Sequence, residues 1–227
     1  MALSKIDVSK MITGVTPLTN GGTGGTSIPA TNLASGVTGT LPVASGGTGL
    51  TSGTTDQFLK FTGTTTVASS AVSAGITEAD TWRITTNFQG NTSPITANWE
   101  RDDTYQNGNM GTGMSQSSGI FTFPSTGFYL ITFNMQFSSA AADNDYILNS
   151  IQLHDGASSY SDVGFSYCSI KNSSTYQMNT LSKIMDITNT SNQKVCFKTS
   201  SQDNNHYVQC DSNQNATYAM FIKLGAT

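Results

Sequence analysis

Apolar and polar residues alternate in short runs along the second half of the chain. Residues 128–137 carry the clearest run, and its apolar positions share one face: Tyr129, Ile131, Phe133, Met135 and Phe137. Because successive residues of a strand point to opposite faces, this pattern predicts a strand with one buried face. Clusters of Asn, Asp, Gly and Ser, which favour turns, separate it from similar runs. These are 82–86, 97–101, 119–124, 146–154, 162–171, 176–187, 193–200, 206–210 and 217–224.

The spacing of these runs indicates a fold class. No helical period extends over residues 80–227, and the runs follow one another at intervals of about 8–12 residues, as in antiparallel sandwiches. Two packed antiparallel sheets would bury the apolar face of each strand. The sequence therefore predicts a mostly β protein whose second half is a sandwich or jelly roll of about ten strands.

The first half of the chain has a different chemistry. Between Met11 and Thr55 there is no charged and no aromatic residue, and Gly, Thr and Ser dominate. Such a segment cannot bury enough apolar surface to offset the cost of ordering its backbone, which is about 1–2 kcal/mol per residue. We therefore expect that residues 1–75 do not fold into a globule by themselves, whereas residues 80–227 do.

The first half of the chain contains a repeat. Residues 16–27 recur as residues 41–52, with Pro, Gly-Gly-Thr-Gly and Thr-Ser in the same frame. A flexible linker is one interpretation, but a repeated Pro and Gly frame favours a repeated backbone shape. A sustained Gly-X-Y period, which collagen needs, is missing, and so is the lysine of a phosphate-binding loop. We expect an extended stalk that gains order by intertwining with copies of itself.

Composition excludes several function classes. The 227 residues carry a net charge of −4, and only 11% of them are charged. Nucleic-acid binding needs clustered Lys and Arg, and membrane insertion needs about 18 consecutive apolar residues, so we expect neither. Asp7 interrupts the stretch where a secretory signal would be apolar. We therefore expect a product made in a cytosol, and no residue pattern calls for a cofactor.

One block of the second half resembles a known family. Gly119-Ile120-Phe121-Thr122-Phe123-Pro124, followed by Gly127-Phe128-Tyr129-Leu130-Ile131, resembles the Gly-x-Phe-x-x-Pro-x-x-Gly-x-Tyr-x-Phe core of the trimeric heads of the complement q subunit and tumour necrosis factor. Ile131 replaces the last Phe of that pattern, and Asn192-Gln193 stands where a Gly-Asp pair is usual. The resemblance covers residues 80–227 and implies a ten-strand jelly roll that assembles as a homotrimer.

The first half resembles bacteriophage tail fibres, especially those of marine phages. The leader Met1-Ala2-Leu3-Ser4-Lys5-Ile6-Asp7, the Pro-x-x-x-Gly-Gly-Thr-Gly repeats and the Gln57-Phe58-Leu59-Lys60 segment are similar to such fibres. The resemblance implies three parts: a virion-attachment leader (1–20), a repeat stalk (21–79) and a jelly-roll head (80–227). It also implies a structural protein of the virion, made in the host cytoplasm and assembled on the particle.

These resemblances imply a role and partners. The expected function is host attachment by a trimeric tail fibre, with other virion proteins held by the leader and a host-surface glycan or protein bound by the heads. The alternatives are a capsid-attached decoration or vertex fibre, a glycan-processing enzyme, and a bacterial surface lectin. We expect the leader to anchor through Leu3, Ile6, Val8, Met11 and Ile12, and the head to contact its receptor through Tyr160, Tyr167 and Tyr207.

Other residues offer weaker chemistry. Asp143 and Asp145 could give oxygen ligands to calcium, as could Asp102 and Asp103, but acidic pairs usually only turn the chain. His154 and Asp155 are adjacent, so on a strand they would point to opposite faces and could not form a catalytic pair with a serine. We therefore expect no enzyme and no resident metal.

The sequence also predicts the surroundings of His206 and of two cysteines. His206 follows a polar loop, and we expect it at the surface. Cys196 and Cys210 flank that loop, so they could face each other across one hairpin. A bridge between them is possible, but two inert thiols are the expectation in a cytosolic product.

Overall fold

The computed structural model describes most of the chain beyond residue 50. The described residues are 48, 50, 52–64, 66–71, 75–106, 108–139, 143–155, 157–171 and 175–227. Most of the predicted stalk and the whole leader, with Leu3, Ile6, Val8, Met11 and Ile12, lie outside them. The chain divides into two compact units, Met1–Ser73 and Ala74–Thr227. The predicted boundary between stalk and head, at residues 79 and 80, falls six residues after this division.

The first unit holds one antiparallel hairpin in the segment expected to be stalk. Its strands are β1 (Gln57–Phe61) and β2 (Val67–Ala71), paired from Gln57 with Ala71 to Phe61 with Val67. Every residue of β1 is exposed, including Phe58 (45%), Leu59 (51%) and Phe61 (69%). The hairpin therefore has an ordered backbone pattern but no core within the described part of its own chain.

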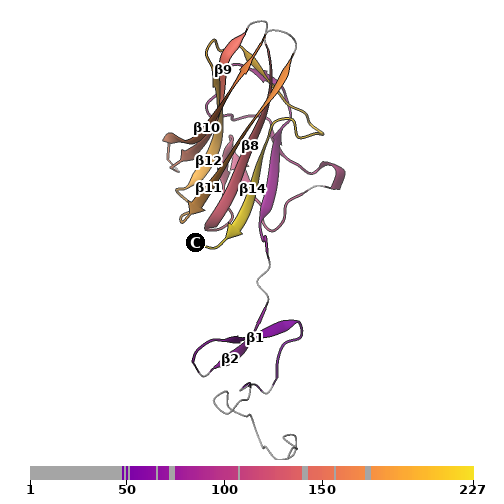
Figure 1. Ribbon diagram of the computed structural model, residues 1–227, viewed down its shortest axis with the longest axis vertical. Coiled ribbons are helices and arrows are strands. Elements are labelled where there is room, and N and C mark those ends of the chain that lie inside the picture. The colour runs from indigo at the N-terminus through magenta and orange to yellow at the C-terminus, as the bar shows by residue number, and fades with distance from the viewer. Residues whose placement is uncertain are drawn as a thin grey trace, which may run out of the picture. The chain divides into compact units, whose positions relative to one another are not determined.

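The second unit is built from two antiparallel sheets (Figure 1). Its strands are β3 (Ala79–Ile84), β4 (Phe88–Gln89), β5 (Trp99–Arg101), β6 (Ser115–Ser117), β7 (Ile120–Thr122), β8 (Gly127–Ser139), β9 (Asn144–His154), β10 (Tyr160–Ile170), β11 (Tyr176–Ile187), β12 (Lys194–Ser201), β13 (His206–Gln209) and β14 (Tyr218–Gly225). One short 3-10 turn, η4 (Thr104–Gln106), interrupts them. Each of the ten predicted runs overlaps one of these strands, whereas β4 and β6 were not predicted.

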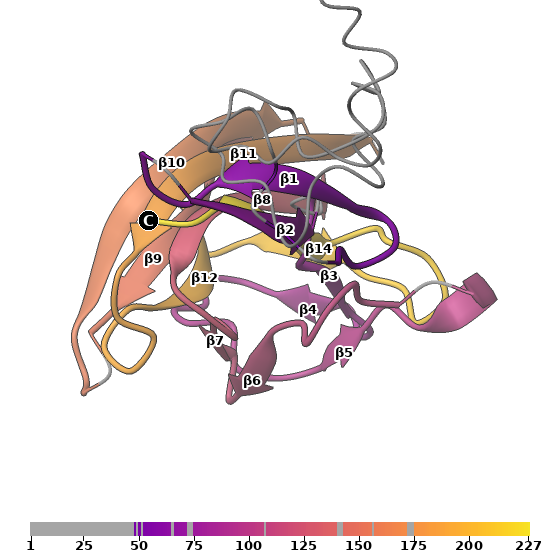
Figure 2. The same ribbon diagram turned by 90° about the horizontal axis from the view of Figure 1, so that it is seen from below.

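The strand order is that of a jelly roll. The five-stranded sheet runs β10-β9-β12-β7-β6. The seven-stranded sheet runs β4-β13-β8-β14-β3-β5, with β11 on the other side of β8. Without the short β4 and β13, each sheet has five strands, and the chain switches between sheets after β5, β7, β8, β10, β11 and β12. Figure 2 shows β10 and β11 side by side where edges of the two sheets meet. The ten-strand jelly roll is therefore confirmed.

Aromatic side chains fill the space between the two sheets. Phe133 of β8 stacks on Phe197 of β12 with ring centroids 4.4 Å apart, and Phe121 of β7 lies 5.0 Å from Trp99 and 5.2 Å from Phe221. The predicted inward face of 128–137 is confirmed, because its five apolar residues are at most 1% exposed. Burial of this kind contributes about 1.5–3 kcal/mol for each large apolar side chain, which makes this cluster the main source of the fold's stability.

A buried ionic cluster closes one edge of the seven-stranded sheet. Arg83 of β3 is 1% exposed, and its guanidinium donates to Asp102 (2.7 Å), with Glu100 3.0 Å away. Asn215 donates its side-chain N–H to the other oxygen of Asp102. Asp102 is therefore the counter-ion of the buried Arg83. Both of its carboxylate oxygens already have protein partners, which argues against a role as a calcium ligand. Among the described residues no helix is long and apolar enough to span a membrane.

Candidate functional site

The outward face of the seven-stranded sheet carries exposed apolar side chains. Because Tyr129 and Ile131 point into the core, their neighbours Phe128 and Leu130 point outward. The strand register places Ile184 of β11 and Ile222 of β14 on either side of Leu130. We call the following set the apolar sheet face: Phe128, Leu130, Ile184, Met220 and Ile222. Its most exposed members are Ile184 at 58% and Phe128 at 40%.

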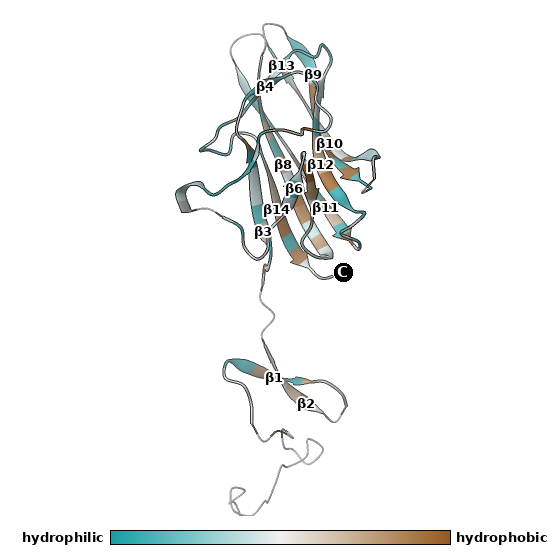
Figure 3. Ribbon diagram, turned by 180° about the vertical axis from the view of Figure 1, so that it is seen from behind, coloured by the Kyte–Doolittle hydropathy of each residue, from teal (hydrophilic) through white to brown (hydrophobic). Residues whose placement is uncertain are grey.

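Charge is scarce on this face. In the register rows centred on Leu130, Thr132 and Asn134, the outward residues of β14, β8 and β11 are neutral. Their polar members bond to one another, as Thr132 does to Ser182 (2.9 Å). The charge in the neighbouring row is Asp186, which faces Phe128. Figure 3 shows brown positions alternating with paler or teal ones along these strands. Depletion of charge around exposed apolar groups is typical of a surface that contacts another protein.

The apolar sheet face could have been predicted from the sequence, although the prediction of strand 128–137 considered only its inward face. The run 128–137 begins Phe128-Tyr129-Leu130-Ile131, so it is apolar on both faces at its start. A strand that covers only one core needs one apolar face. The outward face of β8 is therefore more apolar than the core of its own unit requires.

The three tyrosines predicted to contact a receptor lie at separate places. Tyr160 and Tyr167 are on β10, at its beginning and toward its end, whereas Tyr207 is on β13 of the other sheet, paired with Gln89 and Ser138. All three are between 40% and 56% exposed. They form no single site, and their role as receptor contacts stays a prediction.

Tyr167 belongs to a second exposed aromatic cluster. Its ring lies edge-on to Tyr146 (centroids 5.8 Å apart) and to Phe165 (5.3 Å) on the outward face of the five-stranded sheet. Phe165 is 57% exposed. The cluster provides a matched comparison for the apolar sheet face, because it offers similar exposure on the opposite layer.

The acidic residues considered for calcium do not converge. Asp143 pairs with Lys171 (2.9 Å) at the exposed start of β9, and both side chains are more than half exposed. Asp145 lies two residues further on and is exposed. Over the described ranges, no three His, Cys, Asp or Glu side chains come together in a way that could hold a metal ion.

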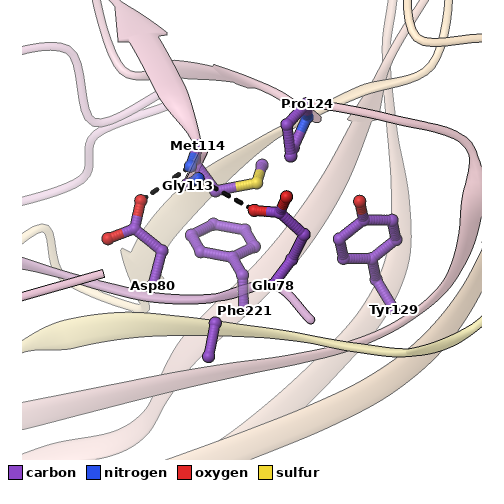
Figure 4. Close-up of a pocket in the computed structure, with 8 residues that line it drawn as sticks. Glu78, Asp80, Gly113, Met114, Pro124, Tyr129 and Phe221 are labelled. Atoms are coloured by element: carbon purple, nitrogen blue, oxygen red, sulfur yellow. Dashed lines mark hydrogen bonds between the residues drawn. The ribbon is translucent and has the colours of Figure 1, made fainter. Parts of the chain in front are cut away.

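Two acids of β3 and its approach line a small cavity instead (Figure 4). Glu78 accepts the backbone N–H of Gly113 (2.9 Å), and Asp80 accepts that of Met114 (2.7 Å). The cavity beside them is about 10 Å³, and Tyr129 and Phe221 line its other side. This volume holds about one water molecule. The two carboxylates therefore anchor the segment before β6 onto β3 and leave no room for a larger ligand.

Near the β12–β13 connection the structure excludes the possible Cys196–Cys210 hairpin pair, and the expected surface position of His206 is wrong. β12 belongs to the five-stranded sheet and β13 to the seven-stranded sheet, so Cys196 and Cys210 do not face each other across one hairpin. Both are free thiols, and burial raises the pKa of each to about 12. His206 is not at the surface: it is fully buried, and its ring nitrogens bond to the hydroxyls of Thr199 (3.0 Å) and Ser201 (2.8 Å).

The adjacent His154 and Asp155 have different surroundings. His154 ends β9 and is 5% exposed, with the ring of Tyr160 at a centroid distance of 4.8 Å. Asp155 begins the following turn, where its Oδ1 accepts the backbone N–H groups of residues 157, 158 and 159. These bonds lower the pKa of the Asp155 carboxyl. Asp155 therefore shapes the turn, as turn-forming acids commonly do.

Comparisons with known proteins find similar solved structures but no matching family or curated protein. No family model matches the chain, and no curated protein matches it. Among solved structures, murine APRIL at pH 5.0 is similar with 13% identity and a TM-score of 0.48, over 65% of this chain and 98% of that one. Eiger TNF from S. frugiperda is similar with 10% identity and a TM-score of 0.49, over 68% of this chain and 96% of that one.

Proposed function

We propose that this chain is the subunit of a homotrimeric bacteriophage tail fibre. In this proposal the leader joins the fibre to the particle, the repeat segment forms the stalk, and the jelly-roll heads face the host surface. The phage assignment rests on the order of three sequence features: the Met1–Asp7 leader, the Gly-Gly-Thr-Gly repeats and the head.

The apolar sheet face is the observation that carries self-association. Ile184, Leu130 and Ile222 form one uncharged row across three adjacent strands, and Ile184 is 58% exposed in the single chain. Covering such a row removes apolar surface from water at about 25 cal/mol per Å². Identical subunits offer the same face, so the simplest cover is another copy of the chain.

Three heads on one stalk would bind more firmly than one head. Once one head has bound, the others act at a raised effective concentration, and avidity can exceed single-site affinity by about 10²–10⁴-fold. Host attachment therefore does not require a deep pocket on each head. Shallow, weak contacts suffice if the heads engage together.

The oligomeric state tests this proposal directly. Analytical ultracentrifugation of the full chain should give about three times the single-chain mass of 24.0 kDa. Ile184→Lys places a charge at the β11 end of the uncharged row and should shift the mass toward one chain. Phe165→Lys is the matched control, because Phe165 has the same exposure but lies on the other sheet.

Two results would contradict the proposal. A wild-type chain that sediments at a single-chain mass excludes the trimer. A Phe165→Lys variant that dissociates while Ile184→Lys does not would place the contact on the other layer. Gold-labelled antibodies against the head should bind the tails of intact phage particles in electron micrographs, whereas label on the capsid would favour the decoration role.

A further inference from the structure

One row of side chains crosses four strands of the five-stranded sheet. The register pairs Tyr160 of β10 with His154 of β9, His154 with Lys194 of β12, and Lys194 with Thr122 of β7. Directly paired residues of adjacent strands share one face of a sheet. These four side chains, which come from segments far apart in the sequence, therefore lie next to one another, and we call them the Tyr160–Thr122 row.

The row lines a hollow of the size that small ligands occupy. Its volume is about 460 Å³, within the usual range of about 300–1,000 Å³ for ligand sites. Two turns border it: Ser117 and Ser118 come from the β6–β7 turn, and Ala157 and Ser158 from the turn after β9. Hydroxyl groups of Ser117, Ser118, Thr122 and Ser158 thus surround a central imidazole and ammonium.

Lys194 brings a positive charge that has no partner among the described residues. Within the described part of the chain its ammonium takes part in no ion pair, and it makes no side-chain hydrogen bond there. Three other lysines of the head do have partners: Lys198 pairs with Asp162 (3.0 Å), Lys171 pairs with Asp143 (2.9 Å), and Lys223 donates to the hydroxyl of Ser125 (2.9 Å). Asp155, which follows His154 of the row in the chain, uses its Oδ1 to accept three backbone N–H groups of its own turn.

Tyr160 supplies a flat apolar surface beside this charge. Its ring is 40% exposed and stands edge-on to His154, with centroids 4.8 Å apart and planes at 63°. His154 is only 5% exposed, and its ring packs against the ring of Tyr160. An exposed aromatic ring with polar groups around it suits a ligand that has an apolar face and a polar rim.

We infer that the Tyr160–Thr122 row binds a sugar ring that carries one negative group, either a carboxylate or a sulfate ester. The ring would lie against Tyr160, the anion would meet the ammonium of Lys194, and the serine and threonine hydroxyls would bond to the sugar hydroxyls. A doubly charged phosphate fits less well, because such groups are usually held by clusters of Arg or Lys. The inference rests on the proposed host-recognition function and names its ligand class.

Calorimetric titration of the full chain with three tetrasaccharides tests this inference. The probes are a tetragalacturonate, a sulfated galactotetraose and the neutral galactotetraose. We expect at least one anionic probe to bind about tenfold or more tightly than the neutral one, because a charge-assisted hydrogen bond is stronger than a neutral one. The probe that binds better identifies the anion.

Variants of Lys194 locate the contact. Lys194→Gln should lower the affinity for the anionic probe about tenfold, and Lys194→Arg should restore most of it, which also shows that the site tolerates substitution. Lys183→Gln is the matched control, because Lys183 is an exposed lysine of β11 in the other sheet. Tyr160→Leu should weaken binding of the anionic and neutral probes alike.

The possible outcomes distinguish failure of this inference from failure of the proposed function. Equal affinity for the neutral and anionic probes, or an unchanged affinity in Lys194→Gln, overturns the inference. A wild-type chain that binds none of the three probes also overturns it, while a three-chain mass and labelling of phage tails would leave the proposed function standing. A single-chain mass with no labelling overturns the proposed function, and the preference for the anionic probe can still be measured on that chain.

Discussion

The hairpin of the first unit and the head of the second unit are both built from antiparallel strands, but their apolar side chains differ in burial. In β1 every side chain is exposed, and Phe61 is 69% exposed. In β8 the five inward apolar side chains are at most 1% exposed and lie against a second sheet. Both elements are antiparallel strands joined in register. They differ in whether the chain itself supplies a second layer.

This difference shows where order within one chain comes from. A two-stranded hairpin alone is at best marginally stable in water, and a sheet becomes stable when something packs against its apolar side. Phe58, Leu59 and Phe61 have no such cover within the described part of the chain. The hairpin is therefore expected to gain its stability from neighbouring chains in the proposed trimer, whereas the head carries its own core.

The largest expected effect comes from removing a core ring of the head. Phe133→Ala deletes a buried ring that stacks on Phe197 and should lower the free energy of unfolding by about 3–5 kcal/mol. The head's two tryptophans, Trp82 and Trp99, are the only ones in the chain, so their fluorescence during urea denaturation reports on the head alone.

Phe61→Ala is the counterpart in the hairpin. It should leave the tryptophan transition within about 0.5 kcal/mol of wild type, because Phe61 belongs to the other unit and is mostly exposed. It should instead raise the concentration at which the three-chain species dissociates. A large loss of head stability in Phe61→Ala, or none in Phe133→Ala, would refute the contrast between the two units.

Acid should weaken the head through one buried histidine. Burial lowers the pKa of His206 from 6.5 to about 4. Between these values the unfolded chain binds a proton that the folded head does not, so stability is full above pH 6.5 and falls as the pH approaches 4. The loss should reach about 3 kcal/mol.

Urea denaturation at several pH values measures this effect. His206→Gln should flatten the slope between pH 6.5 and 4, although its stability at pH 7 will be lower. His154→Gln should keep the slope, since it leaves His206 and its bonds to Thr199 and Ser201 in place. An unchanged slope in His206→Gln would assign the acid sensitivity to another group.

A smaller effect should come from one turn glycine. Gly119 has a φ of +72°, and a Cβ at this position would lie 1.9 Å from the carbonyl oxygen of Ile95. Gly119→Ala should therefore cost about 1–3 kcal/mol in the tryptophan transition. Gly53→Ala in the first unit, where the nearest atom is the Ser69 hydroxyl at 3.4 Å, should leave the transition unchanged.

Most strands of the fold could be predicted because the alternation that marks a strand lies within a short stretch of sequence. The alternation in residues 128–137 identified β8 and all five of its inward apolar residues. The strand β4 was missed because it has only two residues, and β6 was missed because its sequence Ser-Gln-Ser contains no apolar residue that could show an alternation.

The rest depends on contacts that no local pattern encodes. His206 was expected at the surface because it follows a polar loop, yet the chain switches sheets there and the serine and threonine that satisfy its ring belong to β12. Tyr160 was picked out from the sequence, but its alignment with Lys194 and Thr122 follows from the register of four strands. Such an alignment appears only when the whole sheet is assembled.

The neutrality of the rows around Leu130 has a consequence for the conditions under which subunits could meet. Contacts between uncharged surfaces are not weakened when mobile ions screen Coulomb forces, and strongly hydrated salts even favour them. Self-association through this face would therefore persist in brine as well as in dilute buffer. A fibre joined in this way would withstand shifts in salinity that pull apart assemblies built on ion pairs.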